Sequence, residues 1–112
     1  MIKSLSILTR KPHLTHAEFR RVWEGEHAPM VRAVPGVRRY VLSFVLDQPS
    51  GALVPILPVD VDAVAELWYD DRAALARAGA SPELKAVLEN GARYLGGIKT
   101  LITEEVAIIG SI

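Results

Sequence analysis

Two periods of hydrophobic and polar residues alternate along the chain, and the switches between them predict its elements. Residues 2–10 follow the period of two that is typical of a strand, with Leu5 and Ile7 on one face and Ser4 and Ser6 on the other. A proline soon after this stretch ends it, because proline has no N–H to donate to a strand ladder. The chain therefore begins with a strand.

A helical period follows and predicts a helix from about 16 to 33. Thr15 is a favourable N-cap, and Glu18 stands where a capping box places its acid. Pro29 lies inside this helix, and a proline ring displaces the preceding turn. We therefore expect a kink or a tightened turn just after His27.

Turn and cap residues divide the rest of the chain into shorter elements. Pro35-Gly36 and Gly96-Gly97 mark stops, and Ser81 before a proline marks the start of a helix. The loop after the second strand is rich in proline and is too apolar for a plain solvent loop, so we expect it to cover another part of the protein. The predicted elements are a strand over 37–47, this loop over 48–58, a strand over 61–69, helices over 72–78 and from 81 to about 94, and a closing strand over 98–109.

The order strand, helix, strand, strand, helix, strand predicts an α+β fold in a single domain over residues 1–112. This order is that of the ferredoxin-like βαββαβ arrangement, a four-stranded antiparallel sheet with both helices on one face. Residues 37–47 are largely apolar on both faces, so the uncovered face of the sheet also needs a partner. We therefore expect a homodimer that forms through the sheet faces.

Composition narrows the classes of function. The chain has 13 basic and 13 acidic residues, and this balance gives no general attraction to nucleic acid or to an anionic membrane. It has no cysteine, which excludes disulfides and thiolate chemistry, and its three histidines match no compact metal site. Without a signal peptide or a membrane-spanning run in the sequence, we expect a cytoplasmic protein with no metal and no cofactor.

Two motifs carry a resemblance to a known family. They read T-H-A-E-F-R-R-V-W-E-G-E-H-A-P over 15–29 and P-G-V-R-R-Y-V over 35–41. Together with A-E-L-W-Y-D over 65–70, they resemble the EthD family of dimeric α+β barrel proteins. The second half of the chain is similar to the methylmuconolactone methylisomerases, which are cofactor-free enzymes of aromatic catabolism.

The resemblance implies a ferredoxin-like protomer, a dimer packed sheet to sheet, and a pocket between the sheet and the helices of each protomer. It matches His27, Tyr40 and, as a pocket wall, Trp68. The chain departs from the isomerases at Leu53, where they have a histidine, and at Leu67, where they have a cysteine. Because both changes remove a polar group, they argue against that particular isomerisation.

Three residues are candidates for catalysis. His27 ends an aromatic stripe on the face of the helix that meets protein, and its imidazole titrates near neutrality; the alternative is a buried histidine bonded to a carbonyl. Tyr40 is suited to donate to an enolate-like oxygen, or else is a core tyrosine. Glu66 lies in an apolar strand, where burial would make it a base, or where it pairs with an arginine across a dimer.

Four further residues are candidates for substrate binding. Arg38 could hold a carboxylate, although an ordinary charge at a strand end explains it as well. The aromatic residues could form the walls of a cavity or belong to the core; they are Trp23, Phe44 and Trp68.

These residues favour a cofactor-independent isomerase, lyase or cyclase that acts by proton transfer. Its substrate would be a small unsaturated lactone or an aromatic or polyketide-like molecule. The alternative from another class is a non-catalytic dimeric accessory or ligand-binding protein of a catabolic or biosynthetic pathway. A third hypothesis is a cofactor-free monooxygenase or a haem-binding dimer.

Overall fold

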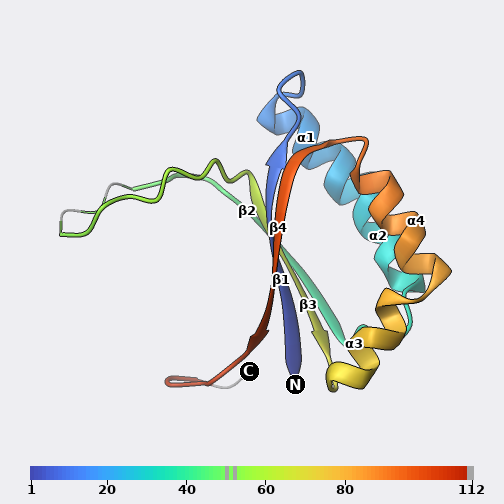
Figure 1. Ribbon diagram of the computed structural model, residues 1–112. Coiled ribbons are helices and arrows are strands. Elements are labelled where there is room, and N and C mark those ends of the chain that lie inside the picture. Colours follow the sequence, from blue (N-terminus) through green and yellow to red (C-terminus); the bar gives the residue numbers. More distant parts are fainter. Residues whose placement is uncertain (50, 52, 111–112) are drawn as a thin grey trace.

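A four-stranded sheet carries all the helices on one side (Figure 1). The computed structural model describes residues 1–49, 51 and 53–110. In chain order the elements are β1 (Ile2–Arg10), α1 (His16–Val22), a π-helical turn (Trp23–His27), α2 (Ala28–Met30), a 3-10 turn (Val31–Ala33), β2 (Arg39–Phe44), β3 (Ala63–Tyr69), α3 (Arg72–Gly79), α4 (Pro82–Gly91) and β4 (Leu95–Glu104).

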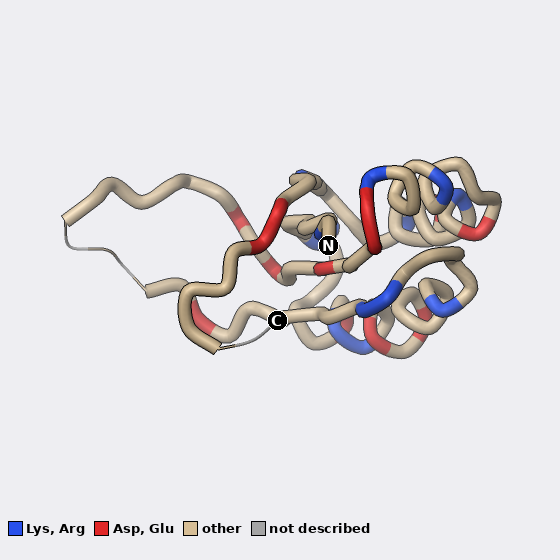
Figure 2. The backbone as a smooth tube through the Cα atoms, turned by 90° about the horizontal axis from the view of Figure 1, so that it is seen from below, with Lys and Arg blue, Asp and Glu red and all other residues tan. Residues whose placement is uncertain are grey.

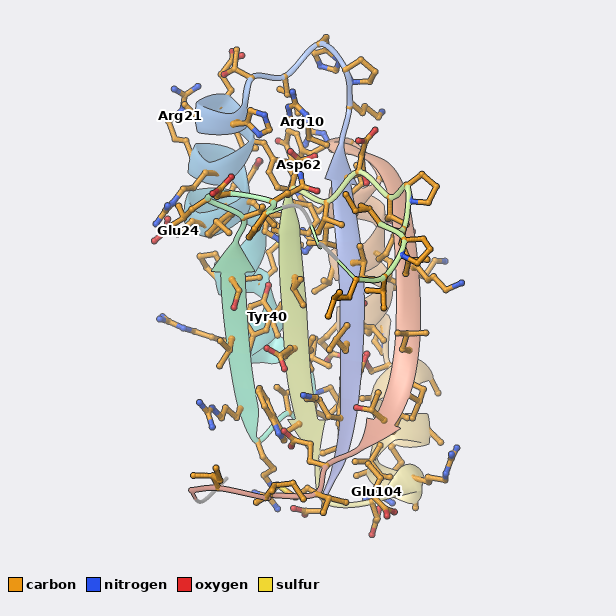
Figure 3. All side chains as sticks on the ribbon, turned by 90° about the vertical axis from the view of Figure 1, so that its left-hand side faces the viewer. Arg10, Arg21, Glu24, Tyr40, Asp62 and Glu104 are labelled. Atoms are coloured by element: carbon orange, nitrogen blue, oxygen red, sulfur yellow. The ribbon has the colours of Figure 1, made fainter. Side chains whose placement is uncertain are left out.

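The strands lie in the order β2-β3-β1-β4, and each neighbouring pair is antiparallel. This arrangement confirms the ferredoxin-like α+β fold expected from the order of the elements. Figure 2 shows the two helical segments side by side over the sheet, with acidic and basic residues on both. The other face of the sheet has no helix in front of it (Figure 3).

The alternation of side chains along β1 follows the predicted pattern. Ser6 and Leu8 are buried toward the helices, and the residues between them point to the uncovered face. Ser6 lies between Ala65 of β3 and Thr100 of β4 in the register of the sheet. The helix-facing floor of the sheet therefore combines hydroxyl and small apolar side chains.

The first helical segment begins as predicted, with Thr15 and Glu18 forming both hydrogen bonds of a capping box. A kink or a tightened turn was expected just after His27, but the irregularity lies over Trp23–His27, and the tightened 3-10 turn comes only at Val31–Ala33. The turn over Trp23–His27 is widened instead, with Ala28 N–H bonded to the carbonyl of Trp23. A proline ring clashes with the carbonyl four residues before it, so a widened turn ahead of Pro29 accommodates the ring without ending the helix.

Three strands differ from the prediction at their ends: β3 begins at Ala63 rather than at 61, and β4 ends at Glu104 rather than at 109. The strand expected over 37–47 is shorter, since β2 spans only Arg39–Phe44. The glycines expected to precede the last strand are part of it, because β4 begins at Leu95. A Cβ atom at Gly96 would lie 2.9 Å from the carbonyl oxygen of Arg10, so the close approach of β1 and β4 requires glycine there.

The buried core is divided into two clusters. One joins the end of the first helical segment to α3 and α4, and includes Val31, Tyr69 and Val87. The other joins β1 to α1, and includes Leu8 and Phe19. Tyr40 packs against both clusters, so it lies near the boundary between them.

The described residues of the loop between β2 and β3 form an arm (residues 46–49, 51 and 53–59) that extends away from the sheet on the side without helices (Figure 1). Its apolar side chains remain exposed: Leu53 is 97% exposed and Leu57 is 80% exposed. The expectation that this loop covers another part of the chain is therefore not met within one protomer. A short tail after β4 leaves the sheet on the same side (Figure 1) and also exposes apolar residues, including Ile109.

Every helix in the described part of the chain is too short or too polar to cross a membrane.

A candidate active site between sheet and helices

A cavity of about 720 Å³ separates the sheet from the helices. Its volume is that of a site for a small molecule. The first helical segment contributes Trp23, His27 and Val31, and the opposite wall comes from α4. The floor is formed by the helix-facing residues of the four strands, which include Ser4, Ser6, Leu8, Tyr40, Ala65, Leu67, Ile98, Thr100 and Ile102.

His27 lies in this cavity with only 5% of its surface exposed. Its ring stacks on Trp23, with centroids 3.6 Å apart and an angle of 19° between the planes. In a regular α-helix, side chains four residues apart are offset by about 40° around the axis. A widened turn rotates less per residue and reduces that offset, so the π turn favours direct stacking of these two rings.

The hydrogen bond to α4 sets the orientation of the imidazole. Nδ1 of His27 lies 3.0 Å from Oδ1 of Asn90, and because this amide oxygen only accepts, Nδ1 carries the proton. Nε2 is then the unprotonated nitrogen, and it has no hydrogen-bond partner among the described residues. The next residue, Gly91, permits this approach, since a Cβ there would lie 3.2 Å from both His27 Cε1 and Trp23 Cη2.

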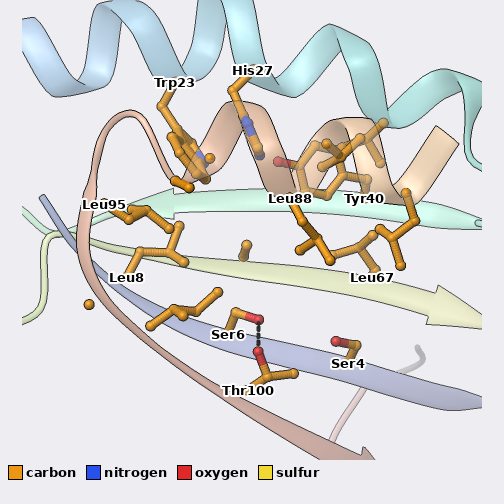
Figure 4. A pocket seen from close by; sticks show the side chains of 18 of the residues that line it. Ser4, Ser6, Leu8, Trp23, His27, Tyr40, Leu67, Leu88, Leu95 and Thr100 are labelled. Atoms are coloured by element: carbon orange, nitrogen blue, oxygen red, sulfur yellow. Dashed lines mark hydrogen bonds between the residues drawn. The ribbon is translucent and has the colours of Figure 1, made fainter. Parts of the chain in front are cut away.

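Burial changes the proton affinity of His27 and of Tyr40. Desolvation lowers the pKa of His27 below 6.5, although its bond to Asn90 acts in the opposite direction, so the ring is neutral at pH 7. Desolvation raises the pKa of Tyr40 to about 12, so its hydroxyl remains a donor. Figure 4 shows Tyr40 reaching from β2 toward the helical layer near His27. A neutral base and a neutral donor therefore share one apolar space.

A row of hydroxyl groups lies across the cavity from His27. Ser6 and Thr100 are hydrogen-bonded at 2.9 Å between Oγ and Oγ1, and Ser4 follows on the same strand face (Figure 4). Each hydroxyl both donates and accepts, so this row offers uncharged hydrogen-bonding groups.

The structure brings three of the predicted site residues together at the cavity: His27, Tyr40 and Trp23. Within the described residues, the buried Nε1 of Trp23 is without a hydrogen-bond partner. Its ring continues into a stack with Phe19, at 5.3 Å between centroids. Trp23 is thus at once a cavity wall and a core residue.

Glu66 and Trp68 lie on the opposite face of the sheet, so the structure does not bring them together with His27. Their strand parity is opposite to that of Ala65 and Leu67, which line the cavity. Glu66 accepts a hydrogen bond from Lys3 at 2.7 Å. Trp68 donates its Nε1–H to Glu105, and the guanidinium of Arg39 lies 4.7 Å from a ring centroid of Trp68. The resemblance that placed Trp68 in a pocket wall needs this correction.

Arg38 and Phe44 also lie outside the cavity. Arg38 precedes β2 and forms two hydrogen bonds with the exposed carboxylate of Asp70, at 3.1 and 2.8 Å. This pairing raises the pKa of Arg38 and lowers that of Asp70. Phe44 is partly buried and packs against the core cluster that contains Leu8, so it contributes to the core beside the site and does not line the cavity.

Asn90 was missed from the sequence. It stands next to a glycine at the end of a helix, where an Asn-Gly pair is an ordinary stop signal. Its distance of 63 residues from His27 in the chain gave no reason to connect the two.

The model of the EthD domain matches residues 11–96, which contain most of the cavity wall. The chain belongs to the EthD domain family. Its resemblance to this family in the helix motif and in the Pro-Gly turn is therefore confirmed.

Two relatives that are more than 25% identical in sequence match nearly the whole chain. A protein of Pseudomonas reinekei named 4-carboxymethyl-4-methylbutenolide mutase is 30% identical over 107 residues, which is 95% of this chain and 99% of that protein. The crystal structure of an EthD family protein from Bacillus halodurans is 26% identical, with a TM-score of 0.75, and covers 95% of this chain and 100% of that one. A dimeric ferredoxin-like protein of unknown function from Thermobifida fusca shares the fold, with a TM-score of 0.64 at 14% identity over 91% of this chain and 88% of that one.

Proposed function

We propose that this EthD domain is a cofactor-independent isomerase of a small unsaturated lactone, acting by proton transfer in the cavity between sheet and helices. The observation that carries the proposal is the neutral imidazole of His27, held by Asn90 with Nε2 left to act as a base. The relationship to a butenolide mutase supports the choice of a lactone.

In the proposed reaction Nε2 of His27 removes a proton from a carbon next to the conjugated system of the lactone. The electron pair of that C–H bond moves into the ring and leaves an enolate, whose oxygen accepts a hydrogen bond from Tyr40. The imidazolium then returns the proton to a different carbon, so the double bond moves and no atom is gained or lost. An enolate is stabilised more by a fixed phenol in an apolar site than by water.

Deuterium exchange tests this proposal. The protein is incubated in D₂O with non-conjugated and conjugated methylbutenolides, and exchange and double-bond migration are followed by NMR. We expect wild-type protein to incorporate deuterium at the migrating position, and expect His27→Ala and Tyr40→Phe to slow it by about a hundredfold or more. Binding of a lactone without exchange would instead favour the ligand-binding alternative.

The same proposal includes a homodimer packed through the uncovered sheet faces. That face presents Leu5, Val41 and Val64 half-buried and Leu101 39% exposed, and the apolar arm extends from the same side. That a Thermobifida fusca protein with this fold is dimeric supports a dimer, and the apolar sheet face supports its place. Analytical ultracentrifugation tests it: Leu101→Lys should weaken the dimer, while Leu88→Gln, at an exposed leucine on the helical side, should not.

A further inference from the structure

We infer that the cavity selects a neutral substrate and rejects a carboxylate, in contrast to the acid for which the Pseudomonas reinekei mutase is named. The inference rests on the proposed function, since it concerns the substrate class of the same cavity. It means that the substrate carries its polar atoms as uncharged groups, such as a lactone carbonyl together with an ester, an amide or a hydroxyl.

The lining of the cavity supplies the first argument. Among the described residues that line it, none is an aspartate, glutamate, lysine or arginine. Its polar groups are the imidazole of His27, the phenols of Tyr40 and Tyr69 and the hydroxyls of Ser4, Ser6 and Thr100. All of these hydrogen-bond to a neutral oxygen, but none supplies the positive charge that a buried carboxylate needs as its partner.

Three cations on or beside the strands of the sheet are already paired outside the cavity. Arg38 is bonded to Asp70, and Lys3 is bonded to Glu66 on the opposite face of the sheet. Arg10 is bonded to the buried carboxylate of Asp62 at the end of β1. Recruiting any of them for a bound acid would break an existing ion pair, and Lys3 would have to cross the sheet.

The apolar residues of the cavity also favour a neutral ligand. Leu67 lines the floor, and Leu88, Ile98 and Ile102 line the cavity while remaining 59%, 54% and 42% exposed. They form an apolar rim at the open side, so a ligand passes hydrocarbon before it reaches the hydroxyl groups. An ionised carboxylate that moves past such a rim loses its hydration and finds no partner of opposite charge. A neutral ring loses little hydration free energy and is stabilised by the burial of its apolar surface.

A matched pair of ligands tests the inference: 4-carboxymethyl-4-methylbutenolide and its methyl ester, which differ in one charge. Isothermal titration calorimetry at pH 7.5 on the full chain measures both affinities without depending on turnover. We expect the ester to bind at least about tenfold more tightly than the acid. Equal or tighter binding of the acid, or binding of neither ligand, would overturn the inference.

Two variants at the rim provide the control. Leu88→Arg places a cation beside the cavity at a site exposed enough to keep its head group in water. It should raise the affinity for the acid several-fold and leave the ester nearly unchanged, whereas Leu88→Gln should not raise it. If Leu88→Arg leaves the preference for the ester untouched, charge is not what selects the ligand and the inference fails. Binding of the ester without deuterium exchange would contradict the proposed isomerase but not this preference.

Discussion

Nδ1 of His27 and Oδ1 of Asn90 lie 3.0 Å apart across the top of the cavity. This contact joins the π turn of the first helical segment to the end of α4. It fixes which nitrogen of the ring carries the proton, and in this respect Asn90 is a positioning residue for the proposed base.

Replacement of Asn90 tests this relationship. Asn90→Ala should reduce kcat by about ten- to a hundredfold, because the buried Nδ1–H loses its acceptor and the ring is free to change tautomer. Nitrogen-15 NMR of the His27 side chain should show the proton on Nδ1 in wild type and a mixture of tautomers in the variant. A wild-type spectrum with the proton on Nε2 would contradict the assignment.

Asn90→Asp should act differently, because a carboxylate beside Nδ1 favours the imidazolium and raises the pKa of His27. The rise of kcat/KM with pH should then occur at higher pH than in wild type. A pH profile that overlays that of wild type would mean that residue 90 does not contact the ring in solution.

The pH dependence of the wild-type reaction follows from the two shifted groups. Activity should rise as pH passes the lowered pKa of His27, so the midpoint lies below the ordinary value of 6.5. Tyr40, with its pKa at about 12, stays protonated, so the plateau should continue to about pH 10. Steady-state kinetics in buffers of constant ionic strength measure this profile. A loss of activity centred between pH 8 and 9 would implicate another group.

Burial of neutral His27 also links stability to pH. The folded pKa is lower than the unfolded one, so the unfolded chain binds the proton first as pH falls. The stabilisation is fully present above about pH 6.5 and is lost as pH falls toward the folded pKa. Urea unfolding at a series of pH values should show this loss in wild type and a smaller one in His27→Gln.

Gly91 should tolerate no side chain without an effect on the site. In Gly91→Ala the new Cβ meets His27 Cε1 and Trp23 Cη2 at 3.2 Å, so the stacked rings must shift by a few tenths of an ångström. We expect kcat to fall by about three- to tenfold. Gly79→Ala is the matched control, because its Cβ meets nothing within 4 Å; its activity should be unchanged, and its stability unchanged or higher by up to about 1 kcal/mol. Equal kcat values for both variants would show that the rings of His27 and Trp23 can move aside without an effect on the reaction.

Glu66 provides a test of the separation of the two sheet faces. Because its carboxylate is bonded to Lys3 on the face away from the cavity, Glu66→Gln should leave kcat within about twofold of wild type. Its stability should fall by at most about 1 kcal/mol. The variant should be compared with wild type where both are folded and in the same oligomeric state. A fall in kcat of more than tenfold under these conditions would mean that Glu66 takes part in the reaction.

Local signals in the sequence predict the fold, but they predict only part of the candidate site. Caps such as Thr15 and the alternation along β1 are read from neighbours in the sequence, so they predicted the order of the elements and the sheet. Strand parity places Glu66 and Trp68 on one face of β3, but the sequence does not say which face meets the helices, because apolar residues lie on both. Asn90 was out of reach because its role depends on packing between helices far apart in the chain.

The exposed apolar arm should make a single chain sensitive to proteolysis. Residues 48–59 contain no charged residue, and Leu53 and Leu57 are almost fully in water when the protomer is alone. In the proposed dimer a second subunit would cover these side chains, so a newly synthesised chain would expose this apolar, protease-accessible arm until the dimer forms. Because the arm contains no lysine or arginine, a protease that cleaves beside apolar residues is needed to test this; its rate of cleavage in the arm should fall as protein concentration rises, even though the cavity beside His27 lies on the other side of the sheet.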